Sequence, residues 1–480
     1  MKSSDEVQHV SKVGLPLKIW GYLLGGILLF RAILTWFIPP IADESYYLMW
    51  ASHLDWSYVD HPGMIAWTTA LFIPFFSNAL FAARAASFVW LLGTLFWIYK
   101  TFRLTEDRHT SVKGCVFFVL IPFIFVVGML MQVEQPLIFF VAMMLFGYAK
   151  WLKTGQKRWF FCMVTALGLG LLSKYSIIIL AGALLIHLLS SSKRGLLLRP
   201  EIPLGIGLVL LISSPLWIWN AQNHWISFLF HTKRVGEAQW FVHLVEYLGD
   251  QILYLSPVLL WSVYRLRKRQ ATSELSSLYG SVSLLIFGFF AILSIKTKVY
   301  ANWPAMGIVP LTLWIVPKAS RAEHPNRLWI QMGMFTGLVC GILLLVSPGV
   351  LRLTPQVQYN HVIASELKRT SRQLQQPVYF FGDSNGTVGI LSYYLDGPVY
   401  FSTLFSDASL WGVQQFLRWP HPQLKRGDTV ILFAKLSPEL RLKLSKYFYS
   451  VKPLPWHLTV LEGHISEKSF VVCEGFLMDR

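Results

Sequence analysis

The sequence is dominated by apolar runs that are long enough to cross a lipid bilayer. Uncharged stretches such as residues 114–131, 175–192, 275–295 and 328–350 reach or approach the ~18–20 residues that a spanning helix needs. Only 14% of the residues are charged, against about 25% in an ordinary soluble domain. Together with less regular runs, these stretches predict a polytopic α-helical membrane protein with about eleven transmembrane helices. The expected spans start near Leu17, Ala79, Gly114, Gln135, Trp159, Tyr175, Ile202, Gln251, Leu278, Pro304 and Leu328.

The distribution of basic residues predicts how these helices are oriented. The net charge of +17 comes from Lys and Arg that are dispersed between the apolar runs, which is typical of a topology signal and argues against nucleic-acid binding. Most of them fall on alternate connections, such as residues 150–158 and 265–269. The positive-inside rule places these connections and the N-terminus in the cytoplasm. The remaining basic residues between spans are Lys174, Lys233, Arg234, Lys296 and Lys298.

The connection after the first span, residues 43–67, is acidic and aromatic and contains no Lys or Arg. Carboxylates beside a bilayer are costly unless they bind or react with something, and Tyr and Trp anchor a chain at the headgroup level. We therefore predict a catalytic loop at the outer, periplasmic surface. Its helical spacing favours two short helices in the membrane plane, and a single re-entrant hairpin is the alternative.

Three acidic positions are candidates for chemistry. Asp43 follows two prolines that end the first span, and it is either a general base or the N-cap of the helix that starts at Glu44. Glu134 lies at the outer mouth between the third and fourth spans, where it either is hydrated or faces the same cavity as Asp43. The pair Asp60–His61 indicates a local hydrogen bond more than a metal site, because a metal needs three or four ligands.

Several cations are expected near these acids. Arg31 and Arg84 lie inside spans, toward the outer half, and each is either a phosphate clamp or a partner that snorkels or pairs with an outer-loop carboxylate. Lys174, Lys296 and Lys298 are exceptions to the positive-inside rule at outer span ends, which suggests that an anion binds there. Acidic and basic groups that meet in one outer cavity suit transfer from a lipid-linked phosphate donor, because positive charge stabilises the departing phosphate while a carboxylate takes the acceptor proton.

The tail differs in composition from the rest of the chain. PVYFF, DTVILFA and FVVCEGF predict short buried strands, residues 365–374 and 438–447 predict helices, and GDSNG at 382–386 predicts a turn. We therefore divide the chain into a transmembrane domain, residues 1–349, and a small C-terminal α/β domain in the periplasm, residues 350–480. The turn could hold a phosphate, but an ordinary connection is the more common meaning of such a sequence.

Five segments, taken in order, resemble a known family. DESYYLMWASHLDWSYVDHPGMIAW, QVEQPLIFF, LGLLSKYSIIIL, PLWIWNAQNHWISFLFH and KVYANWPAMGIVPL resemble segments of the bacterial GT-C-type glycosyltransferases, which are related to protein O-mannosyltransferases and to the 4-amino-4-deoxy-L-arabinose lipid A transferase. The resemblance covers residues 1 to about 320. It implies that a sugar is transferred from polyprenyl phosphate, undecaprenyl phosphate in bacteria, to a lipid, glycan or protein acceptor at the periplasmic face of the inner membrane.

The resemblance also implies roles for individual residues. Asp43 becomes the catalytic carboxylate, with Glu44 and Glu134 in support, and Lys174, Tyr175 and Lys298 lie near the donor phosphate. The remaining residues that we expect to bind substrate are Tyr46, Tyr47, Asp60, His61, Arg84, Tyr300 and Trp303. The resemblance implies no cofactor with certainty, and it leaves open whether a divalent cation is needed. The sequence departs from the family at Gly63, where a second Pro is usual, and at Glu134, where Asp is usual.

A lipid or glycan transporter, or flippase, is the competing function. It would predict polar residues that continue through the spans to the cytoplasmic side and an inverted repeat in the sequence. The sequence has neither feature, which favours an enzyme.

Overall fold

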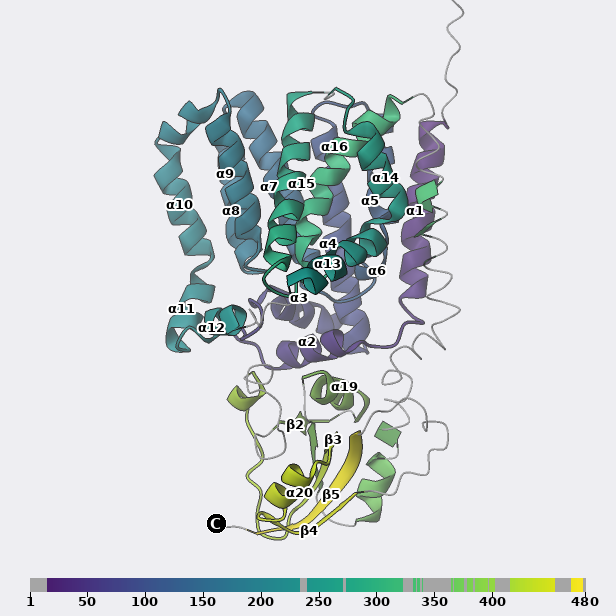
Figure 1. Ribbon diagram of the computed structural model, residues 1–480, viewed down its shortest axis with the longest axis vertical. Coiled ribbons are helices and arrows are strands. Elements are labelled where there is room, and N and C mark those ends of the chain that lie inside the picture. The colour runs from purple at the N-terminus through teal and green to yellow at the C-terminus, as the bar shows by residue number, and fades with distance from the viewer. Residues whose placement is uncertain are drawn as a thin grey trace, which may run out of the picture.

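The structure is a computed structural model in which a helical bundle carries a small sheet domain at one end (Figure 1). The residues described are 15–233, 240–270, 273–322, 331–333, 335–336, 339, 364–365, 367–374, 378–382, 385–395, 397–401, 415–453 and 468–477. We call the end of the bundle beside the sheet domain the loop end, and the other the distal end.

Four of the described helices are long and apolar enough to span a membrane, namely α1 Leu17–Leu34, α4 Ala79–Phe102, α7 Glu134–Thr154 and α15 Glu274–Ser294. A fifth candidate is the pair α10 Glu201–Ile212 and α11 Ser214–Gln222, which is bent by 53°. Other predicted spans are shorter helices, namely α5 Arg108–Leu120, α8 Lys157–Leu171, α9 Ile177–Ser190 and α16 Ile308–Ser320. Most of the span predicted near Leu328 lies outside the described residues, so the total of about eleven stays a prediction.

Two apolar runs that we expected to be continuous helices are broken at proline. Within the run 114–131, α5 ends at Leu120 and a second helix, α6 Pro122–Val127, follows. The span expected from Gln251 falls instead on two helices, the end of α13 Trp240–Leu255 and α14 Pro257–Leu266. Ser256 lies between them with φ 86°. Proline lacks an N–H and collides with the preceding turn, so it starts a new helix where composition alone suggests one span. The Ser256 hydroxyl oxygen caps α14 by accepting hydrogen bonds from its first N–H groups.

The first loop forms the two short helices that its spacing predicts. They are α2 Ala42–Ser52 and α3 Met64–Phe72, and the turn η1 Ile73–Phe75 continues α3. α2 lies across the loop end, between the bundle and the sheet domain (Figure 1). The re-entrant hairpin is therefore the less suitable description of this loop. A third short helix at this end is α12, Ile226–Lys233.

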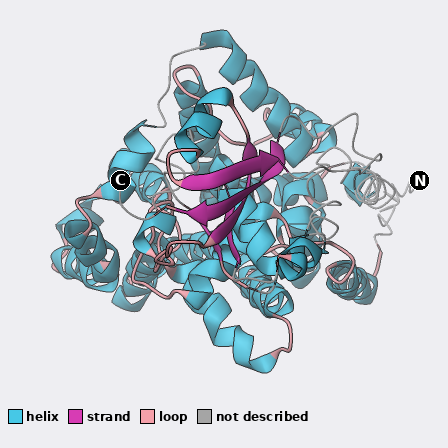
Figure 2. Ribbon diagram, turned by 90° about the horizontal axis from the view of Figure 1, so that it is seen from below, coloured by secondary structure: helices cyan, strands magenta, loops and turns pink. Residues whose placement is uncertain are grey.

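The sheet domain has five strands in the order β2-β1-β3-β5-β4. Seen from below, the sheet lies in front of the helices of the bundle (Figure 2). The strands are β1 Val378–Gly382, β2 Val399–Tyr400, β3 Thr429–Lys435, β4 Phe448–Pro453 and β5 Lys468–Phe476. β1 pairs in parallel with β2 and β3, whereas β5 is antiparallel to β3 and β4. The helices are α19 Asn385–Leu395 and α20 Pro438–Leu444, and residues 364–365 and 367–373 are also helical. The three predicted strands are confirmed.

Two predictions for the tail fall on residues that are not described. The centre of the expected turn at 382–386 is not described, although Gly382 ends β1 and Asn385 begins α19. The boundary between 349 and 350 also lies outside the described residues, so that division stays a prediction.

The sheet domain packs closely on α2 through glycines of α19. A Cβ atom added at Gly389 would lie 2.9 Å from the backbone nitrogen of Tyr46, so only glycine permits this approach. On the same surface the ring of Trp419 stacks on His53 with centroids 4.6 Å apart. Buried side chains of α2 and of the sheet domain form one continuous apolar cluster. The sheet domain therefore contacts the first loop directly.

Candidate active site

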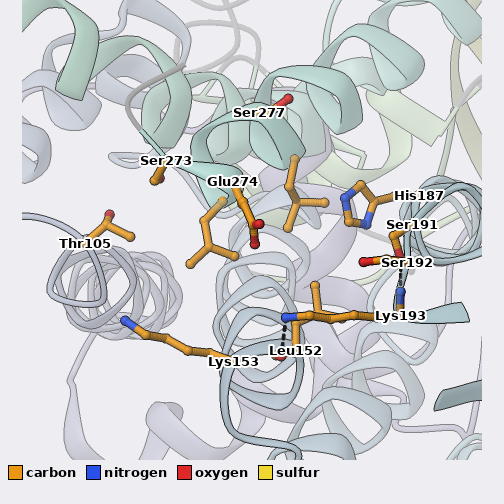
Figure 3. Close-up of a pocket in the computed structure, with 12 residues that line it drawn as sticks. Thr105, Leu152, Lys153, His187, Ser191, Ser192, Lys193, Ser273, Glu274 and Ser277 are labelled. Atoms are coloured by element: carbon orange, nitrogen blue, oxygen red, sulfur yellow. Dashed lines mark hydrogen bonds between the residues drawn. The ribbon is translucent and has the colours of Figure 1, made fainter. Parts of the chain in front are cut away.

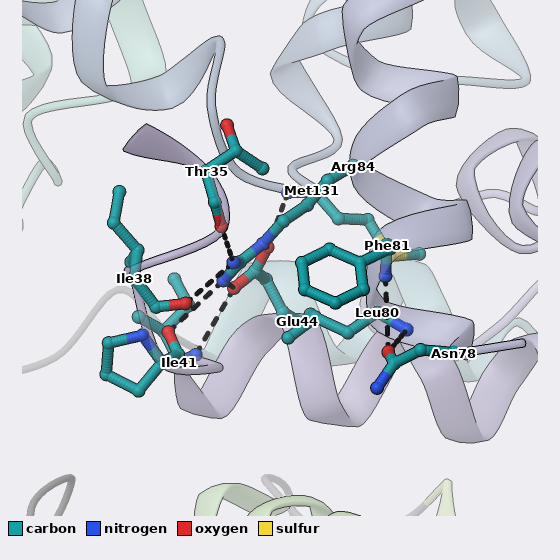
Figure 4. Close-up of polar contacts among 10 residues, drawn as sticks. Thr35, Ile38, Ile41, Glu44, Asn78, Leu80, Phe81, Arg84 and Met131 are labelled. Carbon is teal, nitrogen blue, oxygen red and sulfur yellow. Dashed lines mark hydrogen bonds and ion pairs between the residues drawn. The ribbon is translucent and has the colours of Figure 1, made fainter. Parts of the chain in front are cut away.

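Glu44 anchors the start of α2 inside the protein (Figure 4). Its carboxylate is fully buried and forms a two-point ion pair with Arg84 of α4, at 2.9 Å to Nε and 2.6 Å to Nη2. The same carboxylate accepts hydrogen bonds from the backbone N–H of Met131 at 2.9 Å and of Ile41 at 3.3 Å. All four acceptor positions of Glu44 are thus occupied within the chain. A carboxylate held in this way is suited to positioning α2 and not to removing a proton from a substrate.

Arg84 is occupied to the same extent. Besides the two bonds to Glu44, Nη1 donates to the carbonyl oxygens of Thr35 and Ile38, and Nη2 donates to that of Pro39, at 2.7–3.1 Å. A guanidinium has five N–H groups, and each has a partner here. The expected phosphate clamp is therefore corrected. Arg84 ties the end of the first span to α2, which is the carboxylate pairing that the sequence left as its alternative.

Glu134 and Lys174 form a second buried ion pair at the loop end. Glu134 begins α7, Lys174 follows α8, and the distance from Nζ to Oε1 is 2.6 Å. The same oxygen accepts a hydrogen bond from the Asn302 side chain at 2.8 Å. Three segments that are far apart in the sequence therefore meet here. Lys174 uses one of its three N–H groups in this pair, so it keeps donor capacity for a phosphate oxygen.

Asp43 lies next to Glu44 but is exposed to solvent. The N-cap of α2 is Ile41, so Asp43 is the second residue of the helix and not its cap. A carboxylate in the first turn of a helix interacts favourably with the helix dipole.

Tyr46, Asp60, His61 and Tyr175 surround a third polar region. Burial, followed by the charge of the nearby Asp60 carboxylate, raises the pKa of Tyr46 well above its usual range, so this hydroxyl stays neutral. The rings of His61 and Tyr175 both contact His231, with centroids 6.2 Å and 5.4 Å from its ring. A nitrogen of His231 lies 3.0 Å from the Asp60 carbonyl oxygen. The structure thus brings these four predicted residues together.

Further hydrogen bonds tie the first loop to the bundle. The Trp219 indole donates to the Asp55 carboxylate at 2.7 Å, and the Ser227 hydroxyl donates to the Tyr58 carbonyl at 2.9 Å. The backbone N–H of Met64 donates to the Leu172 carbonyl at 3.0 Å, just before the turn that carries Lys174. All five segments of the family resemblance therefore meet at the loop end.

Other predicted residues lie in different surroundings. Lys298 is half exposed and lies 3.7 Å from Glu246 of α13. Tyr300 is also half exposed, and its ring lies 5.7 Å from that of Trp303, which packs against the bundle core. Tyr47 is buried with its ring 5.0 Å from that of Trp50. These residues line the loop end without joining the two buried ion pairs.

Arg31 lies apart from the two buried ion pairs. It is buried in α1, where Nη2 donates to the Ile124 carbonyl at 2.7 Å and the guanidinium lies 5.1 Å from the centre of the Phe125 ring. These contacts join α1 to α6.

Sequence reasoning missed several residues near the site, among them Asn302, His231 and Gln415. Asn302 could have been found, because it is part of the Asn-Trp-Pro segment. Gln415 of the sheet domain could not, because nothing in its local sequence points to the first loop. Its side-chain oxygen accepts a hydrogen bond from the Val59 N–H at 3.0 Å. Within the described residues, no group of three or more His, Cys, Asp or Glu side chains could hold a metal ion.

Comparison with known proteins shows what the chain is similar to. Residues 60–219 match the family described as dolichyl-phosphate-mannose-protein mannosyltransferase. Together with the bundle, the sheet domain and the convergent first loop, this match over a third of the chain supports a GT-C-type glycosyltransferase related to ArnT.

Individual relatives agree with this class. Lipid A galacturonosyltransferase RgtD from Rhizobium johnstonii is 23% identical over 308 residues, which are 61% of this chain and 64% of that protein. The crystal structure of ArnT from Cupriavidus metallidurans bound to undecaprenyl phosphate has a TM-score of 0.67 at 15% identity, and covers 95% of this chain and 98% of its own. The apo form of that ArnT has a TM-score of 0.66 at 16% identity with the same coverage. The chain therefore shares the ArnT fold.

Proposed function

We propose that this protein transfers a sugar from a polyprenyl phosphate carrier, undecaprenyl phosphate in bacteria, to an acceptor of the cell envelope. The convergence of the five family segments at one end of the bundle is the observation that carries the proposal. The structural neighbour ArnT binds undecaprenyl phosphate, and the relative RgtD acts on lipid A. Lipid A is therefore the acceptor we favour, ahead of a glycan or a protein.

Asp43 is the proposed general base. Its carboxylate accepts the proton of an acceptor hydroxyl while that oxygen attacks the anomeric carbon of the donor sugar. The bond from this carbon to the phosphate oxygen breaks, and polyprenyl phosphate leaves with the electron pair. A phosphate is a good leaving group that needs no proton, so the step requires only positive charge beside it. We assign this charge to Lys174, which is buried and anchored by Glu134.

Glu44 and Arg84 act as positioning residues in this mechanism. They hold the first turn of α2, which carries Asp43, against the end of the first span. We also propose that the loop end faces the periplasm, because the basic connections predict that the distal end is cytoplasmic. The protein would then act at the outer surface of the inner membrane.

Mass spectrometry of envelope lipids and glycans from cells with and without the protein tests this function. We expect a sugar that is present only with the wild-type protein, and its loss in Asp43→Asn. Glu439→Gln, which changes an exposed carboxylate of α20 in the sheet domain, is the control and should retain the product. A sugar that persists at the wild-type level in Asp43→Asn would remove Asp43 from the mechanism. Identical envelopes with and without the protein would contradict the transfer, as would be expected of a flippase, which leaves no new covalent product.

A further inference from the structure

The distal end of the bundle contains a cavity of about 450 Å³ (Figure 3). It lies between the end of α7, the turn after α9 and the beginning of α15. Its volume is in the range of about 300–1,000 Å³ that is usual for small-molecule sites. The cavity is at the opposite end from Asp43, so the sugar transfer proposed above does not account for it.

Both signs of charge line this cavity. Lys153 ends α7, Lys193 follows α9 and Glu274 begins α15, and the side chains of Lys193 and Glu274 extend toward the middle of the cavity from different elements (Figure 3). The hydroxyl groups of Ser191, Ser192 and Ser273 add neutral donors and acceptors.

The charged groups keep unused bonding capacity. Lys153 donates to the Leu104 carbonyl at 2.9 Å and Lys193 to the Leu152 carbonyl at 2.8 Å, which uses one of the three N–H groups of each ammonium. Glu274 forms no ion pair within the part of the chain that the structure describes, although both lysines line the same cavity. The cavity can therefore bind an anionic and a cationic group together.

The cavity is also adjacent to apolar surface. Leu275 and Leu278 of α15 form part of its wall, and the neighbouring α9 exposes Ile186 and Leu189. Exposed side chains of this kind are expected to face lipid tails in a membrane helix. A ligand with a charged head in the cavity could thus place its apolar part along α9.

We propose that this cavity binds the headgroup of a zwitterionic phospholipid of the phosphoethanolamine type. The phosphate lies between Lys153 and Lys193, and the ammonium group binds Glu274. Lysine is a common phosphate ligand as a point charge, and the opposite signs select a headgroup that carries both charges. The acyl chains continue along the apolar face of α9.

Native mass spectrometry of the full-length protein in mild detergent tests the proposal. Phosphatidylethanolamine and phosphatidylglycerol are added in separate experiments, because only the first carries an ammonium group. We expect the wild-type protein to retain more phosphatidylethanolamine. Glu274→Gln should reduce this preference by about three- to fivefold, the size of a partly exposed ion pair. The combined change Lys153→Gln and Lys193→Gln should reduce binding of both lipids by about tenfold, because two such pairs with the phosphate are lost.

Lys268→Ala is the matched control, because Lys268 is an exposed lysine in the connection after α14 that does not line the cavity. Its lipid binding should equal that of the wild type. The proposal is overturned if the wild type retains both lipids equally, or if the double lysine variant binds like Lys268→Ala. It is also overturned if inorganic phosphate displaces the lipid, which would indicate a site for free phosphate. Since these side chains are exposed, the variants should fold, and a size-exclusion profile checks this.

Discussion

Replacing Glu44 by Gln should destabilise the protein strongly, because Glu44 is the centre of a saturated buried network. Four donors point at this carboxylate, from Arg84, Ile41 and Met131. A Gln side chain has one oxygen with two acceptor positions, and its NH₂ group would face donors at the other two. The loss of two charge-assisted hydrogen bonds at about 1.5–3 kcal/mol each gives about 3–6 kcal/mol. Removing one partner of a buried ion pair typically costs about 3–5 kcal/mol, which agrees.

Thermal unfolding of the purified protein in detergent measures this effect. For a chain of this length we expect Tm to fall by on the order of 5 °C. Glu246→Gln is the matched control, because it removes a carboxylate whose ion pair with Lys298 is half exposed. That pair should contribute less than about 1 kcal/mol, so its Tm should hardly change.

A double-mutant cycle tests whether the pair itself is responsible. Arg84→Met should also be destabilising, because it leaves three carbonyl oxygens without their donor. The combined variant should be less destabilised than the sum of the two single variants by about 2 kcal/mol, since neither charge is then left buried alone. Strict additivity, or a Tm for Glu44→Gln that equals that of Glu246→Gln, would refute the reasoning.

Three further predictions concern the rest of the loop end. Lys174→Met should leave Glu134 buried without its cation and should lower both Tm and the rate of sugar transfer. A wild-type rate at saturating donor would show that Lys174 does not stabilise the departing phosphate. Gly389→Val should separate the sheet domain from α2, because its Cβ would collide with backbone, and limited proteolysis should then cut between them; an unchanged pattern would contradict the packing. Gln415→Ala should leave the Val59 N–H buried without its acceptor, at a cost of about 1–3 kcal/mol of stability. Because this bond holds the first loop, kcat should fall clearly while Tm falls by only a few degrees; an unchanged kcat would contradict a positioning role.

Local patterns allowed several features to be predicted from the sequence. Long apolar runs identified most of the helices, and short apolar runs in the tail identified β1, β3 and β5. Two short helices were expected in the first loop and are present as α2 and α3. These features depend on the apolar character and spacing of neighbouring residues, which is visible along the chain. The prediction of continuous helices at 114–131 and after Gln251 was wrong, although Pro122 and Pro257 are visible in the sequence.

The roles of charged residues depended on contacts between distant segments. The sequence by itself determined that carboxylates and cations gather at one end of a membrane bundle. It could not determine that Glu44 and Arg84 saturate each other while Asp43 stays exposed, because adjacent residues of one helix face opposite surroundings. Nor could it place Gln415 on the first loop, 356 positions away in the chain. Tertiary packing decided these roles, because a buried charge must find its partners wherever the fold brings them.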